Sequence, residues 1–388
     1  MINILFIHQS AELYGSDKTL LLLLKHLDRA KFNPVVVLPS EGPLQIELQK
    51  HDIKVVVAPV LKLYRKIFTP KNIFLFFKEI KKAFSILDNL NNEYHFDIIY
   101  SNTLAVLLGM IYAKKRKIKH IWHVHEIIAS PKIFKKSFSK LLSLDSTTKI
   151  VYNSIATQHF WNVSNTIKNK SKVIWNGLEI DENFISEQEK YSIRKNLLHA
   201  DEEIVIALIG RISRWKGQQL LLKTFYELSK NFKNIKLLFV GSVPPNQEIF
   251  LENLKNNIEA LALSEKVIIL PFQQQIAKIW QSIDIAVVPS IEPEPFGLVA
   301  VEAMLAKKPV VASDHGGLSE IIINDETGFL VEPNNETALY EAICKLIANP
   351  EMRNSFGEKG FKRAVNEFGV ENYTAQFENL FIEIEGIR

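Results

Sequence analysis

The stretch "DIAVVPSIEPEPFGLVAVEAMLAKKPVVASD", residues 284–314, contains two short apolar runs separated by a helical pattern. The runs 284–290 and 309–314 have the length and apolar content of buried strands, and a helix is expected between them from near Phe296. Two buried strands joined by one helix form a parallel crossover unit, because parallel neighbours need a long connection. This stretch therefore predicts an α/β fold with a parallel sheet.

The same alternation of short apolar runs and helical patterns continues along the chain. The other predicted strands are "INILFIH" (2–8), "PVVVLP" (34–39), "KVVVAP" (54–59), "DIIYSN" (97–102), "HIWHVHE" (120–126), "KIVYNS" (149–154), "IVIALIGR" (204–211), "KLLFVGS" (236–242) and "KVIILPF" (266–272). Near-continuous apolar strands predict sheets covered by helices on both faces. We expect two Rossmann-like, doubly wound parallel-sheet domains facing each other across a cleft, with an eight-stranded barrel as the weaker alternative.

Domain boundaries follow from chain length and from a polar, turn-rich segment near residues 177–200. With 388 residues, the chain exceeds one typical domain. We expect an N-terminal domain over 1–178 and a C-terminal domain over 179–366. Residues 367–388 predict an amphipathic helix that crosses back to the first domain.

The composition is that of a globular protein, with 47% hydrophobic and 23% charged residues. The single cysteine, Cys344, excludes an intramolecular disulfide framework and a cysteine-based metal cluster. The first residues resemble a strand rather than a signal peptide, and no run approaches the roughly 18 apolar residues of a spanning helix. We expect a cytoplasmic protein, soluble or peripheral on the inner face of the membrane.

Charge is distributed unevenly between the two halves. Residues 1–178 contain 26 Lys and Arg against 12 Asp and Glu, a net charge of +14, and the rest of the chain carries −10. A basic half indicates an anionic partner, which is nucleic acid, a phosphorylated substrate or a membrane surface.

Two carboxylates, Glu294 and Glu302, flank the start of the helix predicted near Phe296. Ligands of doubly wound domains bind beyond the carboxyl ends of the strands, and the N–H groups of Gly297, Leu298 and Val299 would point toward such a ligand. The two glutamates span roughly 12 Å of helix, comparable with the distance from a sugar across a diphosphate to a ribose. The alternative is a helix-capping Glu294 and a surface Glu302.

A second strand-end loop, "GRISRWKG" (210–217), carries Arg211 and Lys216. Two cations beside a helix N-terminus would bind a diphosphate and stabilise it as a leaving group. On its own this loop is a solvated basic turn; its position at a neighbouring strand end favours the diphosphate interpretation.

These motifs, together with "PSIEPEPFGLVAVEAMLAKKPVVASDHGGLSEII" (289–322), "ETGFLVEPNN" (326–335) and "VIWNGLEID" (173–181), resemble those of retaining glycosyltransferases of family 4, which have the B-type fold. The resemblance implies that Arg211 and Lys216 bind the donor diphosphate. It also implies that Glu294 contacts the donor sugar and Glu302 the ribose hydroxyls. The backbone amides of the turn would hold the distal phosphate and sugar: Phe296, Gly297, Leu298 and Val299.

The first domain matches the family less closely. Gly15 and Ser16 stand where the family has a glycine-rich loop, so their backbone could approach the diphosphate, but one glycine of the family pattern is missing and Asp17 stands in place of its Glu. His125 matches the family's strand-end histidine better than His123. The alternatives for the pair are a metal site and buried structural histidines.

A nucleoside diphosphate sugar is the expected donor, and we expect no cofactor and no metal, because the chain has no D-x-D motif. Retention by double displacement would need a carboxylate nucleophile. The resemblance implies front-face substitution instead, with Glu294, His125, Arg211 and Lys216 as the catalytic set and domain closure completing the site. The acceptor would be a saccharide or a lipid-linked saccharide in surface polysaccharide or glycolipid synthesis. Rival functions are a nucleotide-sugar epimerase of this fold and a non-catalytic sugar-nucleotide-binding protein.

Basic residues alternate with aromatic ones in "KLYRKIFTPKNIFLFFKEIKKAF" (62–84) and "PKIFKKSFSKLL" (131–142), and the basic run "KKRKIK" (114–119) lies between them. Such amphipathic stretches suit an anionic membrane surface. Alternatively, Phe68, Phe74, Phe76, Phe77 and Phe84 pack on the sheet. No nucleic-acid-binding motif accompanies them, and we expect no nucleic-acid partner.

Overall fold

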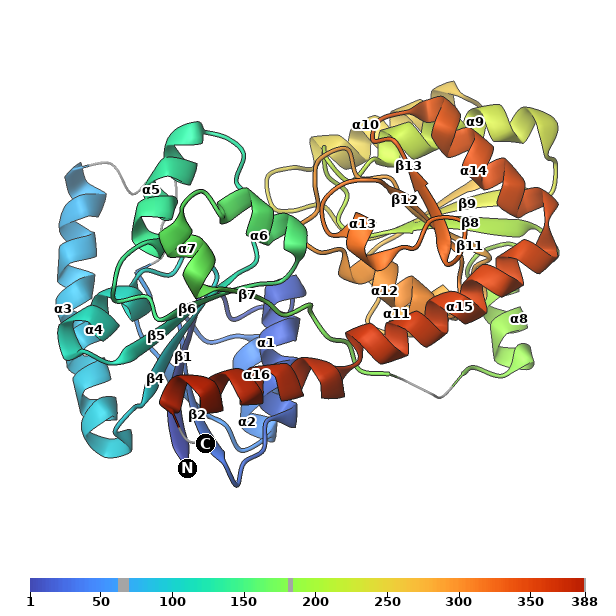
Figure 1. The fold of residues 1–388 in the computed structure, drawn as a ribbon. Coiled ribbons are helices and arrows are strands. Elements are labelled where there is room, and N and C mark those ends of the chain that lie inside the picture. Colours follow the sequence, from blue (N-terminus) through green and yellow to red (C-terminus); the bar gives the residue numbers. More distant parts are fainter. Residues whose placement is uncertain (62–69, 181–183, 387–388) are drawn as a thin grey trace. The chain divides into compact units, whose positions relative to one another are not determined.

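The computed structural model describes residues 1–61, 70–180 and 184–386, with the backbone alone for residues 70–77 (Figure 1). Phe68 therefore lies outside the described residues, as do the side chains of Phe74, Phe76 and Phe77. The chain forms two compact units. The first contains Met1–Glu179 and Gly369–Arg388, and the second contains Ile180–Phe368.

The first unit contains a seven-stranded sheet in the order β3-β2-β1-β4-β5-β6-β7, with every pair parallel. Its strands are β1 (Ile2–His8), β2 (Phe32–Leu38), β3 (Lys54–Val57), β4 (Ile98–Asn102), β5 (Lys119–Val124), β6 (Lys149–Tyr152) and β7 (Ser171–Val173). His8 lies opposite Asn102, and Asn102 lies opposite His123. Polar side chains from three adjacent strands thus meet at the carboxyl edge of the sheet.

Successive residues of the strands face opposite layers of helices, as the two-residue period of a strand requires. On one face, Ile4 and Phe6 of β1 pack with α1 (Gly15–His26), α2 (Pro43–Lys50) and α16 (Val370–Glu385). On the other, Leu5 and Ile7 pack with α3 (Pro70–Tyr94) and α4 (Leu108–Arg116). The remaining helices of this unit cover β5 and β6: α5 (Lys132–Leu142), α6 (Ile155–Trp161) and α7 (Asn165–Lys170).

The C-terminal helix α16 belongs to the first unit and lies along α1 (Figure 1). The ring of Phe381 lies 5.8 Å from that of Phe32 and 6.2 Å from that of Phe6. Two ion pairs at the end of the helix, Lys119–Glu385 at 3.0 Å and Lys149–Glu383 at 2.8 Å, join it to β5 and β6. The apolar face of this amphipathic helix is therefore part of the core of the first unit.

The second unit contains a six-stranded parallel sheet in the order β10-β9-β8-β11-β12-β13. Its strands are β8 (Ile204–Ile209), β9 (Ile235–Val240), β10 (Val267–Leu270), β11 (Ile285–Val288), β12 (Val310–Ser313) and β13 (Gly328–Val331). Its helices are α8 (Glu187–Asn196), α9 (Gln218–Asn231), α10 (Ile249–Ala260), α11 (Ile276–Ser282), α12 (Leu298–Leu305), α13 (Leu318–Ile321), α14 (Glu336–Ala348) and α15 (Pro350–Phe368).

Two open, parallel, helix-covered sheets confirm the predicted Rossmann-like fold class. The barrel alternative is wrong, because each sheet ends in two edge strands rather than closing on itself. Among the described residues, no helix has both the length and the apolar character needed to cross a membrane.

Candidate active site

In the second unit, the loops after β8 and β11 are in direct contact, because these strands are neighbours in the sheet. The Ile291 N–H donates a hydrogen bond to the Trp215 carbonyl over 2.8 Å. Gly217 adopts φ +83°, and a Cβ there would lie 2.0 Å from the Pro289 carbonyl oxygen. Only glycine accommodates both the backbone conformation and this close approach. Gly217, the last residue of "GRISRWKG", thus allows the basic loop after β8 to contact the loop after β11 that carries Glu294.

This contact forms an ion pair between Lys216 and Glu294. Lys216 Nζ lies 2.7 Å from Glu294 Oε1, and their side chains are only 11% and 6% exposed. The Ser290 hydroxyl donates to the same carboxylate oxygen. A buried carboxylate is tolerated when a cation and a hydrogen-bond donor compensate its lost hydration. The N-cap of α12 is Gly297, and the Glu294 carboxylate is bound by Lys216 and Ser290 instead, so the capping alternative is wrong.

The Gly-Gly pair at residues 316–317 holds the backbone of Glu294. Gly316 adopts φ +63°, and a Cβ there would lie 2.3 Å from the Glu294 carbonyl oxygen. The Gly317 N–H donates to this oxygen over 2.8 Å. Beside it, His315 Nε2 lies 2.8 Å from the Ser290 carbonyl oxygen, to which it can donate. The loop after β12 therefore orients the turn that carries the buried carboxylate.

The helix after this turn begins later than the sequence predicts. It starts at Leu298 rather than near Phe296, because Gly297 is its N-cap with φ +116°, a left-handed conformation that is not helical. Phe296 is buried and packs edge-on against Phe368, with ring centroids 5.7 Å apart. The amides of Phe296 and Gly297 thus belong to the turn, and those of Leu298 and Val299 to the first helical turn.

Glu302 lies on α12 and is half-buried. Its Oε2 accepts a hydrogen bond from the indole Nε1 of Trp280, a fully buried residue of α11, over 3.1 Å. The alternative of a solvated surface glutamate is therefore wrong. The two predicted cations differ in environment: Lys216 is partly buried against Glu294, whereas the side chain of Arg211 is exposed at the start of the same loop.

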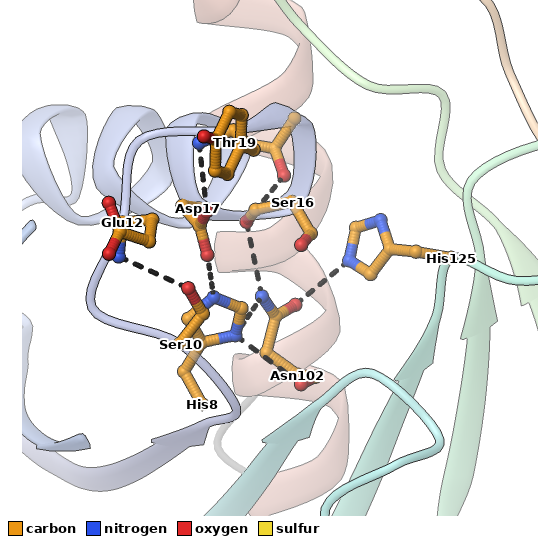
Figure 2. A network of polar contacts seen from close by, with 9 residues as sticks. His8, Ser10, Glu12, Ser16, Asp17, Thr19, Asn102 and His125 are labelled. Carbon is orange, nitrogen blue, oxygen red and sulfur yellow. Dashed lines mark hydrogen bonds and ion pairs between the residues drawn. The ribbon is translucent and has the colours of Figure 1, made fainter. Parts of the chain in front are cut away.

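The first unit carries a separate polar network at the carboxyl edge of its sheet (Figure 2). Gly15 and Ser16 form the first turn of α1, and Gly15 is exposed. His125 follows directly after β5, and its Nε2 lies 2.9 Å from Asn102 Oδ1. The backbone N–H of His125 donates to Glu126 Oε2 over 3.0 Å. Burial raises the pKa of Glu126 to about 7.

The two histidines of "WHVHE" have different environments. The ring of His123 is buried, and its Nδ1 lies 2.5 Å from the Tyr100 hydroxyl. His125 is half-buried beside it, with ring centroids 3.9 Å apart. Burial lowers the pKa of His125 to about 3, so this ring is neutral at physiological pH. Within the part of the chain that the structure describes, no three His, Cys, Asp or Glu side chains are placed to hold a metal ion.

Sequence reasoning missed several residues of these sites. In the first unit they are His8 and Asn102, and in the second Ser290 and His315. His8, Asn102 and Ser290 stand at or just after strand ends, so the rule that selected the other loops would also have found them. Contacts such as that of His315 with Ser290 depend on how separate loops approach one another.

Comparison with models of known protein families identifies the family of this chain. Residues 14–182 match the model described as Glycosyltransferase Family 4, and residues 189–363 match the model described as Glycosyl transferases group 1. The two matches lie in the two units of the B-type fold. The chain is a family 4-type glycosyltransferase.

Relatives of this glycosyltransferase come from bacteria and archaea. The capsular polysaccharide biosynthesis glycosyltransferase CapM of Staphylococcus aureus is 26% identical over 366 residues, 91% of this chain and 90% of CapM. An uncharacterized glycosyltransferase of Methanocaldococcus jannaschii is 30% identical over 246 residues, which cover 62% of this chain and 61% of the relative. The crystal structure of Anabaena HepE in complex with UDP-glucose superposes with a TM-score of 0.85 at 25% identity, covering 99% of this chain and 100% of HepE.

Proposed function

We propose that this glycosyltransferase moves a sugar from a nucleoside diphosphate sugar to a saccharide or lipid-linked acceptor, with retention of configuration and without a metal ion. The observation that carries the proposal is the buried pair of Lys216 and Glu294 at the carboxyl edge of the second sheet. Both groups can bind a sugar nucleotide, and they lie where doubly wound domains bind nucleotides. The similarity to HepE, which was solved with UDP-glucose, supports a sugar-nucleotide donor.

In this proposal, charged side chains take the part that a divalent cation has in other transferases. Lys216 donates to the donor diphosphate, and the exposed Arg211 stabilises its charge as it leaves. The amides from Phe296 to Val299 bind the distal phosphate and sugar, and the dipole of α12 favours an anion at this end. Glu302, oriented by Trp280, accepts hydrogen bonds from the ribose hydroxyls.

The surroundings of Glu294 favour front-face substitution over a covalent intermediate. Its Oε1 accepts hydrogen bonds from both Lys216 and Ser290, which reduces the nucleophilicity of the carboxylate. Glu294 then orients the sugar and stabilises positive charge at the anomeric carbon, while the leaving phosphate assists deprotonation of the acceptor hydroxyl. From the first unit, His125 contacts the donor sugar, and the backbone of Gly15 and Ser16 approaches the diphosphate.

The acceptor is proposed to be a saccharide or lipid-linked saccharide in surface polysaccharide or glycolipid synthesis, in line with the similarity to CapM. An anionic membrane surface is the proposed docking partner of the basic unit, on the cytoplasmic side. Helix α5 supports this proposal, because Lys132, Lys136 and Lys140 are exposed and Ile133 is 69% exposed. By contrast, Phe84 and Phe138 of the basic stretches are buried in the core, so for these two residues packing on the sheet is the correct interpretation.

Donor turnover with and without acceptor tests the proposed function. The purified protein is incubated with UDP- and GDP-sugars, and nucleoside diphosphate release is measured with saccharide acceptors, in EDTA and in Mg²⁺. We expect acceptor-dependent release in EDTA and a product whose anomeric configuration, read by NMR, matches the donor. An epimerised donor without acceptor would indicate an epimerase. Binding detected by thermal shift without release would indicate a non-catalytic protein.

A further inference from the structure

A continuous chain of four polar side chains connects α1 to His125 in the first unit (Figure 2). Asp17 Oδ1 lies 2.5 Å from His8 Nε2, and His8 Nδ1 lies 3.0 Å from Asn102 Nδ2. Asn102 Oδ1 lies 2.9 Å from His125 Nε2. His8, Asp17 and Asn102 are all at most 2% exposed. Water therefore does not compete for these hydrogen bonds, and each group has a defined role as donor or acceptor.

The backbone carbonyl of Ser16 and the carboxylate of Asp17 together set the direction of this hydrogen-bonded network. It lies 3.3 Å from Asn102 Nδ2, so the amide nitrogen, the only donor of that side chain, must face it. The second hydrogen of this nitrogen then points to His8 Nδ1 over 3.0 Å, a shorter contact than the 3.4 Å from Nδ1 to the Asn102 backbone carbonyl oxygen, which assigns Nδ1 as an unprotonated acceptor. The proton of His8 consequently lies on Nε2 and is donated to Asp17.

The same orientation determines the tautomer of His125. Because Asn102 turns its oxygen toward His125, the ring must donate from Nε2. His125 is neutral, since burial lowers its pKa to about 3, so its Nδ1 carries a lone pair. Figure 2 shows this second nitrogen on the side of the ring away from Asn102.

We infer that Asp17 and His8 are positioning residues that hold His125 in the Nε2–H tautomer, so that Nδ1 accepts a hydrogen bond from a hydroxyl of the donor sugar. The inference rests on the proposed function for the contact between His125 and the sugar. Asp17 also ties the network to the first turn of α1, because its Oδ2 accepts from the Tyr14 N–H over 2.8 Å. The loop at Gly15 and Ser16 and the ring of His125 are thus oriented by one set of bonds.

The alternative tautomers identify the contribution of Asp17. Without the carboxylate, His8 no longer has an acceptor at Nε2 and can carry its proton on Nδ1. A proton on His8 Nδ1 would face the amide N–H of Asn102 and favour rotation of that amide, which turns its oxygen to His8 and its nitrogen to His125. This rotation gives up the hydrogen bond to the Ser16 carbonyl, so we expect a mixture of the two orientations, and the rotated one carries the His125 proton on Nδ1. The chain would run in the opposite direction, and Nδ1 of His125 would no longer accept a hydrogen bond from the sugar.

The test combines the tautomer with turnover. Long-range ¹H–¹⁵N NMR of the full chain with labelled histidine distinguishes the tautomers, and His125 is assigned by the signal missing from His125→Ala. We expect Nε2–H in the wild type and in Asp17→Asn, whose amide oxygen can still accept from His8. In Asp17→Leu we expect a substantial fraction of His125 to carry its proton on Nδ1. The kcat of this variant should be about tenfold lower, which corresponds to one hydrogen bond, and its KM for the acceptor should be unchanged.

An Nδ1–H His125 in the wild type would overturn the inference. So would a folded Asp17→Leu protein with the wild-type tautomer and kcat. If Asp17→Leu does not fold, His8→Gln takes its place, and the wild-type spectrum still tests the direction of the chain. The proposed function fails separately: His125→Ala with unchanged kcat would contradict the sugar contact, while the spectra would still report on Asp17 and His8.

Discussion

Lys216 and Glu294 lie 78 residues apart in the sequence, yet their charged atoms are 2.7 Å apart and both side chains are almost completely buried. Three loops produce this pair: Gly217 permits the approach of the basic loop, and Gly316 and Gly317 support the backbone of Glu294. A buried ion pair is costly to break, because the remaining charge lacks compensation. Stability and activity are therefore coupled at this site.

Replacing Lys216 with methionine should both destabilise the second unit and stop transfer. The buried Glu294 would lose its cation, which lowers the free energy of unfolding by about 3 kcal/mol. Adding Glu294→Gln should restore much of the stability but none of the activity, because the double variant has neither charge. Denaturant unfolding and nucleoside diphosphate release measure the two effects. Additive stability losses in the double variant would contradict the coupling.

Removing the Glu294 carboxylate alone should lower kcat by at least about a hundredfold, if it stabilises charge at the transition state. Glu294→Ala and Glu294→Gln are compared under saturating donor, with nucleoside diphosphate release as the measurement. Since Gln can still accept the Ser290 hydrogen bond, it separates charge from position. Near-normal turnover of Glu294→Ala would refute the assignment of this residue to the donor sugar.

A methyl group at Gly316 should disturb the Glu294 turn. Gly316→Ala combines a left-handed backbone with a Cβ only 2.3 Å from the Glu294 carbonyl oxygen, so we expect a loss of about 2 kcal/mol or more and a lower kcat. Gly386→Ala is the matched control: its φ is +78°, but nothing lies within 4 Å of a Cβ there. The control should lose about 1 kcal/mol and keep full turnover. Equal turnover of both variants would contradict the role of Gly316.

How far the sequence predicts the fold depends on the length of each apolar run. The central strands were predicted because their buried residues form uninterrupted apolar stretches, whereas β7 and β13 were missed. β7 has three half-buried residues, and β13 is a four-residue edge strand that begins at Gly328. The start of α12 was placed two residues early, since the left-handed conformation of Gly297 is not visible in residue order.

For the candidate site, the sequence predicts which loops carry chemistry but not which side chains touch. Lys216 and Glu294 were assigned to different parts of the donor, the diphosphate and the sugar, yet the structure pairs them with each other. This pairing depends on the register of β8 against β11 and on the clearance at Gly217, neither of which a linear pattern contains. The roles of Asp17 and His8 were missed for the same reason, because they depend on the orientation of one amide.

Removing the indole donor of Trp280 should weaken donor binding rather than slow the chemical step. Trp280→Phe keeps the buried ring but deletes the hydrogen bond to Glu302, so the carboxylate is no longer held for the ribose. We expect a donor KM several-fold higher with kcat unchanged. Glu302→Gln, which still accepts from Trp280, tests charge separately from orientation. A fall in kcat at constant KM would place Glu302 at the reacting end of the donor instead.

Acid should destabilise the first unit below about pH 6.5. Burial lowers the pKa of His120 and of His125 to about 3 and that of His123 well below its ordinary value. In the unfolded chain these rings take up protons below about pH 6.5, whereas in the folded chain they remain neutral. The buried Glu126 acts in the opposite direction, because its pKa is raised to about 7 and its folded form takes up a proton in this range. Three histidines outweigh one carboxyl, so the unfolded state binds more protons, and each histidine removes up to about 1.4 kcal/mol of stability per pH unit.

Denaturant unfolding of the wild type at pH 7.5 and 5.5 measures this loss. His120→Asn should reduce the pH dependence by about one proton, and His51→Gln, at an exposed position, should leave it unchanged. An unfolding free energy that is constant from pH 7.5 to 5.5 would contradict the neutral, buried state of these rings.

Charge reversal on α5 should abolish binding to anionic vesicles. Lys132 and Lys136 are one helical turn apart, both are exposed, and Ile133 beside them is 69% exposed. Each lysine near an anionic surface contributes about 1 kcal/mol. At low salt we therefore expect the wild-type protein in the floating fraction and the Lys132→Glu, Lys136→Glu double variant in the soluble fraction. Lys233→Glu with Lys255→Glu makes the same change in net charge at exposed positions of the second unit and should float like the wild type. If both double variants float equally, or if the wild type binds neutral vesicles as well, the surface of α5 is not the docking site and its lysines serve only as a solvated helix face.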